Sequence, residues 1–316
     1  MFDTTNTLSN SKLLWTVATA TVTAVGIGAI MRSSSSSSKK VKKMDDESWE
    51  SHVSKLHGSL ETIFPEKLYR LEAPASSDFG PPTRNMFIYR VAVSNGGYEL
   101  LIYNAIAVNE ETLQEILKLG NPSIMVVPND MHICCIGVWK KRFPHLKVIC
   151  FRKPCPTIEQ VVPIDCTLTE LASHDGSVWK ECITVRHIDG WNSFEDILEV
   201  KLSTNKVAMI MCDTLFTVPY QADIGPVGRL IQWIFDSYVD VPAHDGKITV
   251  PKVSRIVRIF VIRDWKQAEA WFRKYASESI YAILVNYGPP VVELDSSEGC
   301  KGALLGVADQ LVKPRW

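Results

Sequence analysis

The pattern of apolar and polar residues from position 86 onward changes repeatedly between the period of a strand and that of a helix. The apolar runs 86–93 and 98–108, separated by Asn-Gly-Gly at 95–97, predict two strands joined as a hairpin. Asn109 is placed to cap a following helix, whose first turn contains two glutamates and which we expect to end before Gly120. This part of the chain is therefore rich in strands.

The same order of elements continues toward the end of the chain. Further strands are predicted at 123–128, 146–151, 180–188, 197–202, 206–213 and 281–288, and further helices at 133–142, at 226–237 and after the capping residue Asp264. Two β-rich halves, each with helices outside its strands, predict an α/β fold in the form of a four-layer αββα sandwich. We expect this domain to occupy residues 48–316.

An uncharged, apolar stretch precedes this domain. Residues 13–31 contain no charged side chain, and a helix of this length rises about 28 Å, close to the hydrocarbon thickness of a bilayer. After a tail of residues 1–12, we therefore expect a transmembrane signal anchor at 13–31. A cleaved signal peptide would begin with basic residues, and a mitochondrial presequence would be rich in arginine, but here the first arginine is Arg32. A loosely apolar, disordered tail is the remaining alternative.

Residues 32–47 combine a run of six serines with several lysines and predict a flexible linker. Basic residues are more numerous after the apolar stretch than before it, so the positive-inside rule places the main domain in the cytosol. The eight cysteines are irregularly spaced, and the sequence contains no Asn-x-Ser/Thr acceptor site, as expected for reduced thiols in that compartment. We expect a single-pass membrane protein whose membrane contact is this N-terminal helix.

Composition narrows the function classes only slightly. The 316 residues are 46% apolar and 22% charged, as in ordinary globular proteins, and a net charge of −1 gives no field that would attract nucleic acid. The sequence lacks Gly-x-Ser-x-Gly, Gly-x-x-x-x-Gly-Lys, Gly-x-Gly-x-x-Gly and Cys-x-x-Cys. Cys150 and Cys155 could form part of a zinc clip, but no second ligand pair is suitably spaced. The similar His-Asp-Gly sequences at 174–176 and 244–246 are typical of surface turns.

Three segments resemble the metallo-β-lactamase superfamily in their order and context. They are 123–150, 209–216 and 282–291. In the first, a buried strand is followed by Asn129 and His132, which is similar to a group of uncharacterised lactamase-like proteins with a Pro-Asn-x-x-His sequence. The second brings Asp213 to the end of a strand, as does the segment that supplies the metal-bridging aspartate in the superfamily. The third resembles a final strand that ends in His-Gly-x-Pro.

The resemblance implies a site for two zinc or iron ions, which needs about five or six His and Asp ligands at loop tips. Most of these ligands are missing. The strict motif Thr-His-x-His-x-Asp-His places Asn129, Met131, Ile133 and Cys134 at its ligand positions, and Tyr287 replaces the last histidine. His187, the nearest mid-chain histidine, lies in a predicted strand and not in a glycine-rich turn. Only Asp213 is in place, and His132 is shifted, although it matches the variant group.

The candidate site therefore consists of Asp213 and His132 as catalytic residues and metal ligands, with Asn129, Cys134 and Tyr287 in the pocket. A purely structural interpretation also stands, in which His132 ends a strand, Cys134 packs a helix and Asp213 caps a loop. We expect no binuclear centre and, as cofactor, either none or at most one zinc ion. The expected function is that of a membrane-anchored binding or scaffold protein that has kept the fold and lost the chemistry, with its ligand or protein partner unidentified. The alternative is a metal-dependent hydrolase with an altered or mononuclear site.

Overall fold

The computed structural model describes most of the predicted domain. The described residues are 48–53, 57–75, 83–94, 96–153, 155–192, 196–220, 225–236, 238–239, 249–292 and 299–312. They belong to one compact unit, Lys43–Trp316. The predicted tail, transmembrane span and linker at 1–47 lie outside the described residues. Within the described ranges, no helix is both long enough and apolar enough to cross a bilayer.

Seven strands form the first sheet, in the order in which they occur along the chain. They are β1 (Glu61–Phe64), β2 (Leu68–Pro74), β3 (Thr83–Ala92), β4 (Tyr98–Tyr103), β5 (Asn121–Val127), β6 (Lys147–Cys150) and β7 (Cys166–Thr167). Strands β1 to β4 pair antiparallel and β4 to β7 pair parallel, so the predicted hairpin of β3 and β4 is confirmed. β4 is shorter than the predicted strand 98–108 because Asn104 adopts a left-handed φ of 56°, which ends the extended run.

The second sheet has the strand order β14-β13-β10-β9-β8. Its strands are β8 (Ile183–Arg186), β9 (Ile197–Ser203), β10 (Lys206–Met211), β13 (Ile280–Val285) and β14 (Val291–Val292). β9 and β10 form the predicted antiparallel hairpin, whereas β13 joins β10 in parallel. β8 covers only the middle of the predicted strand 180–188. A separate pair consists of β11 (Val218–Pro219) and β12 (Tyr238–Val239).

Helices connect many of these strands. They are α2 (Trp49–His52), α3 (Glu110–Leu119), α4 (Ile136–Arg142), α5 (Pro156–Glu159), α6 (Leu168–Ser173), α7 (Gly225–Phe235), α8 (Arg255–Phe260), α9 (Trp265–Tyr275) and α10 (Gly299–Val312). Asn109 caps α3 as predicted, since its Oδ1 accepts a hydrogen bond from the backbone N–H of Thr112 at 2.8 Å, and Asp264 caps α9 in a similar way. α4 begins at Ile136, later than predicted, because the preceding residues form a loop.

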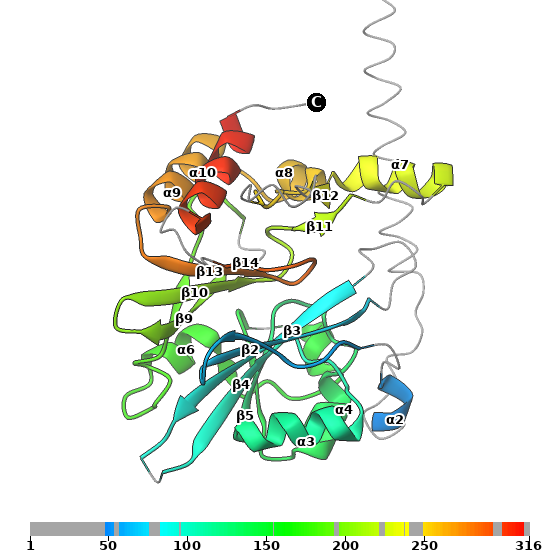
Figure 1. Ribbon diagram of the computed structural model, residues 1–316, viewed down its shortest axis with the longest axis vertical. Coiled ribbons are helices and arrows are strands. Elements are labelled where there is room, and N and C mark those ends of the chain that lie inside the picture. Colours follow the sequence, from blue (N-terminus) through cyan, green and yellow to red (C-terminus); the bar gives the residue numbers. More distant parts are fainter. Residues whose placement is uncertain are drawn as a thin grey trace, which may run out of the picture. The chain divides into compact units, whose positions relative to one another are not determined.

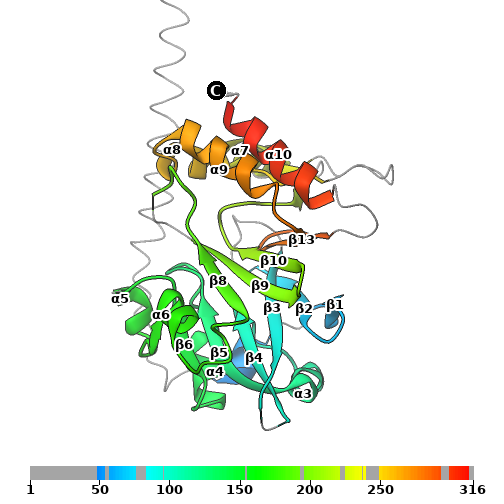
Figure 2. The same ribbon diagram turned by 90° about the vertical axis from the view of Figure 1, so that its left-hand side faces the viewer.

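The two sheets lie face to face, with helices on their outer sides (Figures 1 and 2). Apolar side chains fill three layers, one between the sheets and one between each sheet and its helices. Alternate residues of β3 face opposite ways: Met86 and Ile88 pack on the side of α3 and α4, whereas Phe87 and Tyr89 pack against the second sheet. The other face of the second sheet packs against α9 and α10. The layer order is therefore αββα, and the predicted α/β sandwich is confirmed.

Candidate functional site

The candidate residues lie in loops that follow parallel strands of both sheets. Asn129 and His132 come after β5 of the first sheet, whereas Asp213 follows β10 and Tyr287 follows β13 of the second sheet. β10 and β13 are parallel neighbours, so their carboxyl ends meet at the same edge. Four of the five predicted site residues are thereby brought together; the fifth, Cys134, makes its hydrogen bonds with a neighbouring arginine and cysteine.

His132 and Asp213 form a buried pair at the centre of this group. The Nε2 atom of His132 lies 3.2 Å from Oδ2 and 3.4 Å from Oδ1 of Asp213. Asn129 donates from its side-chain amide to the same Oδ2 at 2.6 Å, and its own Oδ1 accepts the backbone N–H of Met131 at 2.9 Å. The backbone N–H can only donate, so it fixes the orientation of the Asn129 amide with the nitrogen toward Asp213. The Tyr287 hydroxyl lies 3.4 Å from His132 Nε2.

Burial and charge together set the protonation of the group. Burial alone would raise the pKa of Asp213, but the charge that His132 carries when it is protonated, together with the hydrogen bonds from His132 and Asn129, outweighs burial and lowers that pKa. Burial raises the pKa of Tyr287 strongly, and the negative charge of Asp213 raises it further. The site therefore contains a carboxylate, an imidazole and a neutral phenol.

A chain of buried asparagine amides indicates which imidazole nitrogen carries the proton. Asn104 donates from Nδ2 to the backbone carbonyl of Asn85 at 2.7 Å, and the same nitrogen donates to Oδ1 of Asn286. The Asn286 amide therefore presents its nitrogen to Nδ1 of His132, at 3.4 Å. Because an amide N–H only donates, Nδ1 accepts, and the ring proton lies on Nε2, where it faces Asp213.

None of the three asparagines in this hydrogen-bonded series was predicted from the sequence. Asn85, Asn104 and Asn286 are each at most 1% exposed. The available signal was a polar residue at the end of, or within, an otherwise apolar run, because such a residue needs a buried partner. Their partners lie as many as 203 positions away along the chain, so the pattern alone could not pair them.

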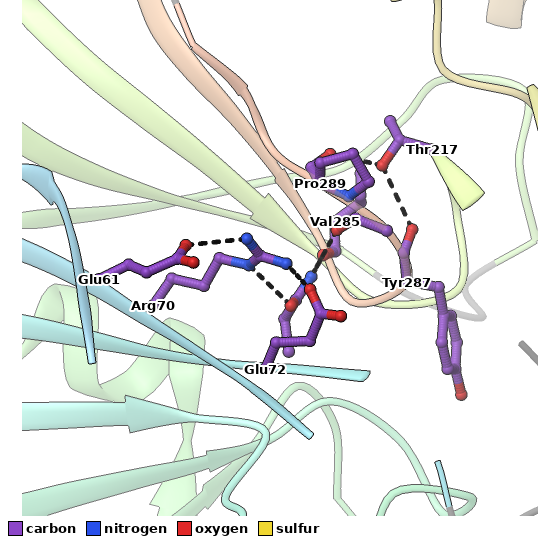
Figure 3. Close-up of polar contacts among 9 residues, drawn as sticks. Glu61, Arg70, Glu72, Thr217, Val285, Tyr287 and Pro289 are labelled. Carbon is purple, nitrogen blue, oxygen red and sulfur yellow. Dashed lines mark hydrogen bonds and ion pairs between the residues drawn. The ribbon is translucent and has the colours of Figure 1, made fainter. Parts of the chain in front are cut away.

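Polar contacts also hold the loop that carries Asn286 and Tyr287 (Figure 3). Asn85 donates to the carbonyls of Val285 and Gly288 at 2.8 and 2.7 Å. Arg70 in turn donates to Asn85 Oδ1 at 2.8 Å and forms ion pairs with two glutamates on β1 and β2. On the other side, Thr217 donates to the carbonyl of Pro289 at 2.5 Å, and the Tyr287 ring stacks on Phe216. The loop is thus fixed by β2 and β3 of the first sheet on one side and by the segment 216–217 on the other.

Cys134 belongs to a neighbouring group of one arginine and two thiols. Arg84 lies with Nη1 2.8 Å from Cys134 Sγ and with Nη2 3.4 Å from Cys135 Sγ, and the two sulfur atoms are 3.7 Å apart. The hydrogen bond from Cys135, followed by the Arg84 guanidinium, outweighs burial and lowers the pKa of Cys134 to about 5. Cys134 was predicted from the sequence, whereas Arg84, which comes from β3, was not.

Among the described residues, one group of His, Cys and Asp side chains has donor atoms close enough to hold an ion. His132, Cys212 and Asp213 each offer one ligand atom, and these atoms lie within 4.8 Å of one another. Imidazole, thiolate and carboxylate are zinc ligands, so the donor types fit one ion. The further positions at which the resemblance implies ligands hold Asn129, Met131, Ile133 and Tyr287, which are not usual zinc ligands. Cys212 was missed because it lies inside an apolar run.

The other sequence candidates lie in different surroundings. His187 follows β8 directly and pairs with Asp196, with 2.6 Å between Nδ1 and Oδ1. Cys150 donates to a backbone carbonyl. His174 and Asp175 line a pocket of about 1300 Å³ that includes none of the predicted site residues. The second His-Asp-Gly sequence, at 244–246, lies outside the described residues.

Comparison with known proteins gives a likeness of fold but none of sequence. No family model and no curated protein matches the chain. The metallo-β-lactamase FIM-1 from Pseudomonas aeruginosa is 11% identical, with 81% of this chain and 96% of that chain covered and a TM-score of 0.44. A metallo-β-lactamase from Hirschia baltica is 8% identical, with 82% and 100% covered and a TM-score of 0.45. At these identities the likeness concerns the fold alone.

Proposed function

We propose that this chain is a membrane-anchored binding protein with a metallo-β-lactamase-like fold whose site works without a binuclear metal centre. The observation that supports this proposal is the direction of the hydrogen bonds at His132. A metal-binding histidine usually donates its other ring N–H to an acceptor, which leaves the ligating nitrogen unprotonated. Here Nδ1 faces the donating amide of Asn286, so Nε2 keeps its proton and points it at Asp213.

The second half of the argument concerns Asp213. A carboxylate that bridges two ions must direct lone pairs of both oxygens at them. Asn129 instead directs an N–H at Oδ2 from a position at which the resemblance implies a histidine ligand. The carboxylate is thus engaged by two protein donors. A polar ligand of the site would meet the Tyr287 hydroxyl and the His132–Asp213 pair, which suits recognition by hydrogen bonds.

A second candidate function is hydrolysis by a single zinc ion, and the position of Cys212 favours it. His132, Cys212 and Asp213 would hold the ion, and three protein ligands leave one coordination position for water. Bound zinc would supply an ionised water near neutral pH. This function requires His132 to carry its proton on Nδ1 and not on Nε2. The Asn286 side chain would then have to rotate so that its amide oxygen faces Nδ1.

Metal analysis of the purified full-length chain distinguishes these functions. The binding protein is expected to retain well under one equivalent of zinc or iron after gel filtration. One equivalent, lost in both His132→Ala and Cys212→Ser but kept in the control His145→Ala, would favour the zinc hydrolase; His145 contacts Asn121 and is outside the group. Two equivalents lost on His132→Ala would contradict the proposal and restore a binuclear enzyme.

The membrane anchor is the other part of the proposal. It is supported by the uncharged stretch 13–31 and the basic residues after it, and the main domain is proposed to face the cytosol. The full-length chain should remain with membranes after carbonate extraction, whereas a chain lacking residues 1–31 should be released more readily. Recovery of the full-length chain in the soluble fraction would contradict the anchor and leave the proposal for the site intact.

A further inference from the structure

Two short helices beside the second sheet expose an unusual number of large apolar side chains. Leu230 and Trp233 of α7 are 56% and 49% exposed, and Ile259 and Phe260 of α8 are 41% and 49% exposed. These four residues, here called the α7/α8 patch, are half of the eight large exposed apolar side chains among the described residues. α7 and α8 pack against each other, so the four side chains come from one local surface.

The charges around the patch are mostly positive, although Asp236, directly after α7, forms an ion pair with the buried Arg258 of α8. α7 and α8 together contain three arginines and no acidic residue. Arg229 is exposed beside Leu230, and the Arg255 guanidinium lies 4.4 Å from the centre of the Trp233 ring, which links the two helices. Exposed Trp, Phe, Leu and Ile next to arginine are the composition of a surface that lies in a membrane interface, where the arginines meet anionic headgroups.

We propose that the α7/α8 patch contacts an anionic lipid bilayer, in addition to any contact made by residues 13–31. The size of the patch favours lipid over a protein partner. Four half-exposed side chains offer a few hundred Å² of surface, whereas a stable protein interface takes about 800 Å² from each partner. Shallow insertion into the headgroup region needs no such area, because each apolar side chain that enters the bilayer adds its own favourable transfer free energy to membrane binding.

A residue-resolved labelling experiment tests this proposal. The full-length chain is reconstituted into phosphatidylcholine vesicles, with or without phosphatidylserine, that contain a phospholipid with a photoreactive acyl chain. Labelled residues are then located by mass spectrometry. We expect labelling in α7 and α8, and more of it when phosphatidylserine is present. Labelling within 13–31 reports the anchor separately, so failure of one contact is distinguishable from failure of the other.

Matched variants make the result specific. Trp233→Ser with Phe260→Ser should lower the labelling of both helices by about tenfold, since each substitution removes apolar surface from the lipid contact. Tyr98→Ser, at a comparably exposed residue of β4, should leave the labelling of α7 and α8 unchanged. Both variants should keep the wild-type melting temperature. Absence of label from α7 and α8 would overturn the proposal. So would a cross-linked dimer through this patch, which would assign it to a second copy of the chain.

Discussion

The side-chain amide of Asn286 donates a hydrogen bond to Nδ1 of His132 across 3.4 Å, and the two residues are 154 positions apart in the sequence. This contact fixes the imidazole as the tautomer with its proton on Nε2. In a zinc site, the second ring nitrogen of a histidine ligand usually faces an acceptor instead.

Asn286→Asp should reverse the tautomer of His132. A carboxylate at this position accepts a hydrogen bond from a protonated Nδ1, so Nε2 becomes available as a ligand. We expect the imidazole ¹⁵N chemical shifts of the wild type to report a protonated Nε2 and those of the variant a protonated Nδ1. The variant should also bind zinc at least about tenfold more tightly, the usual size of an effect from a partner of a ligand. A protonated Nδ1 in the wild type would contradict the assignment.

Asn129→Ala should lower the free energy of unfolding by about 1.5–3 kcal/mol. The substitution leaves a buried carboxylate oxygen of Asp213 without the donor that it has at 2.6 Å, and hydrogen bonds to charged groups are the stronger ones. Denaturation by urea gives the value. Gln114→Ala is the control, because Gln114 makes an exposed hydrogen bond to Glu110 and should change stability by less than about 0.5 kcal/mol. Equal effects of both variants would refute the special role of Asn129.

The stabilising effect of Asp213 should disappear in acid. The pKa of Asp213 is lowered in the folded chain, so its contribution is fully present above the unfolded pKa of about 3.9 and is lost as the pH falls through the lower folded value. The difference in unfolding free energy between the wild type and Asp213→Asn should therefore be constant from about pH 7 to pH 5 and shrink below about pH 4. A difference that persists unchanged in stronger acid would contradict the lowered pKa.

Gly288→Ala should be more harmful than Gly96→Ala. Both glycines have positive φ, 95° and 83°, so both substitutions strain the backbone. A Cβ at 288 would also lie 2.5 Å from the carbonyl carbon of Thr217, whereas a Cβ at 96 would meet nothing within 4 Å. We expect a loss of about 1 kcal/mol at 96 and clearly more at 288, with a shift of the Tyr287 loop. Thermal unfolding of both variants checks the order.

Cys134 should react as a thiolate in weak acid. Its pKa of about 5 predicts that alkylation by iodoacetamide reaches half its maximal rate near pH 5. Arg84→Gln should move this midpoint upward, and Arg84→Lys should move it less, because lysine keeps the charge. Cys182 serves as an internal control, since burial raises its pKa and the thiol is similarly half-buried. An Arg84→Gln variant with an unchanged midpoint would show that the guanidinium does not stabilise the thiolate.

Local pattern predicted much of the fold because strands and helices bury alternate or every third or fourth residue. The runs at 86–93, 123–128 and 206–213 correspond to β3, β5 and β10, and the caps Asn109 and Asp264 begin α3 and α9. β2 was missed because its interior contains Arg70 and Glu72, whose charges are paired only in the folded chain. α10 was missed because apolar residues occur around most of its circumference.

The sequence by itself determined the strand ends at which Asn129, Asp213 and Tyr287 stand, since a buried strand must end at a polar or turn-forming residue. Only the tertiary structure decided what these residues can do. The tautomer of His132 depends on Asn85, Asn104 and Asn286, which lie in or directly after strands of both sheets. Hydrogen-bond direction is a property of atoms in contact, and spacing along the chain does not contain it. The packing of the two sheets therefore decided which proton faces Asp213.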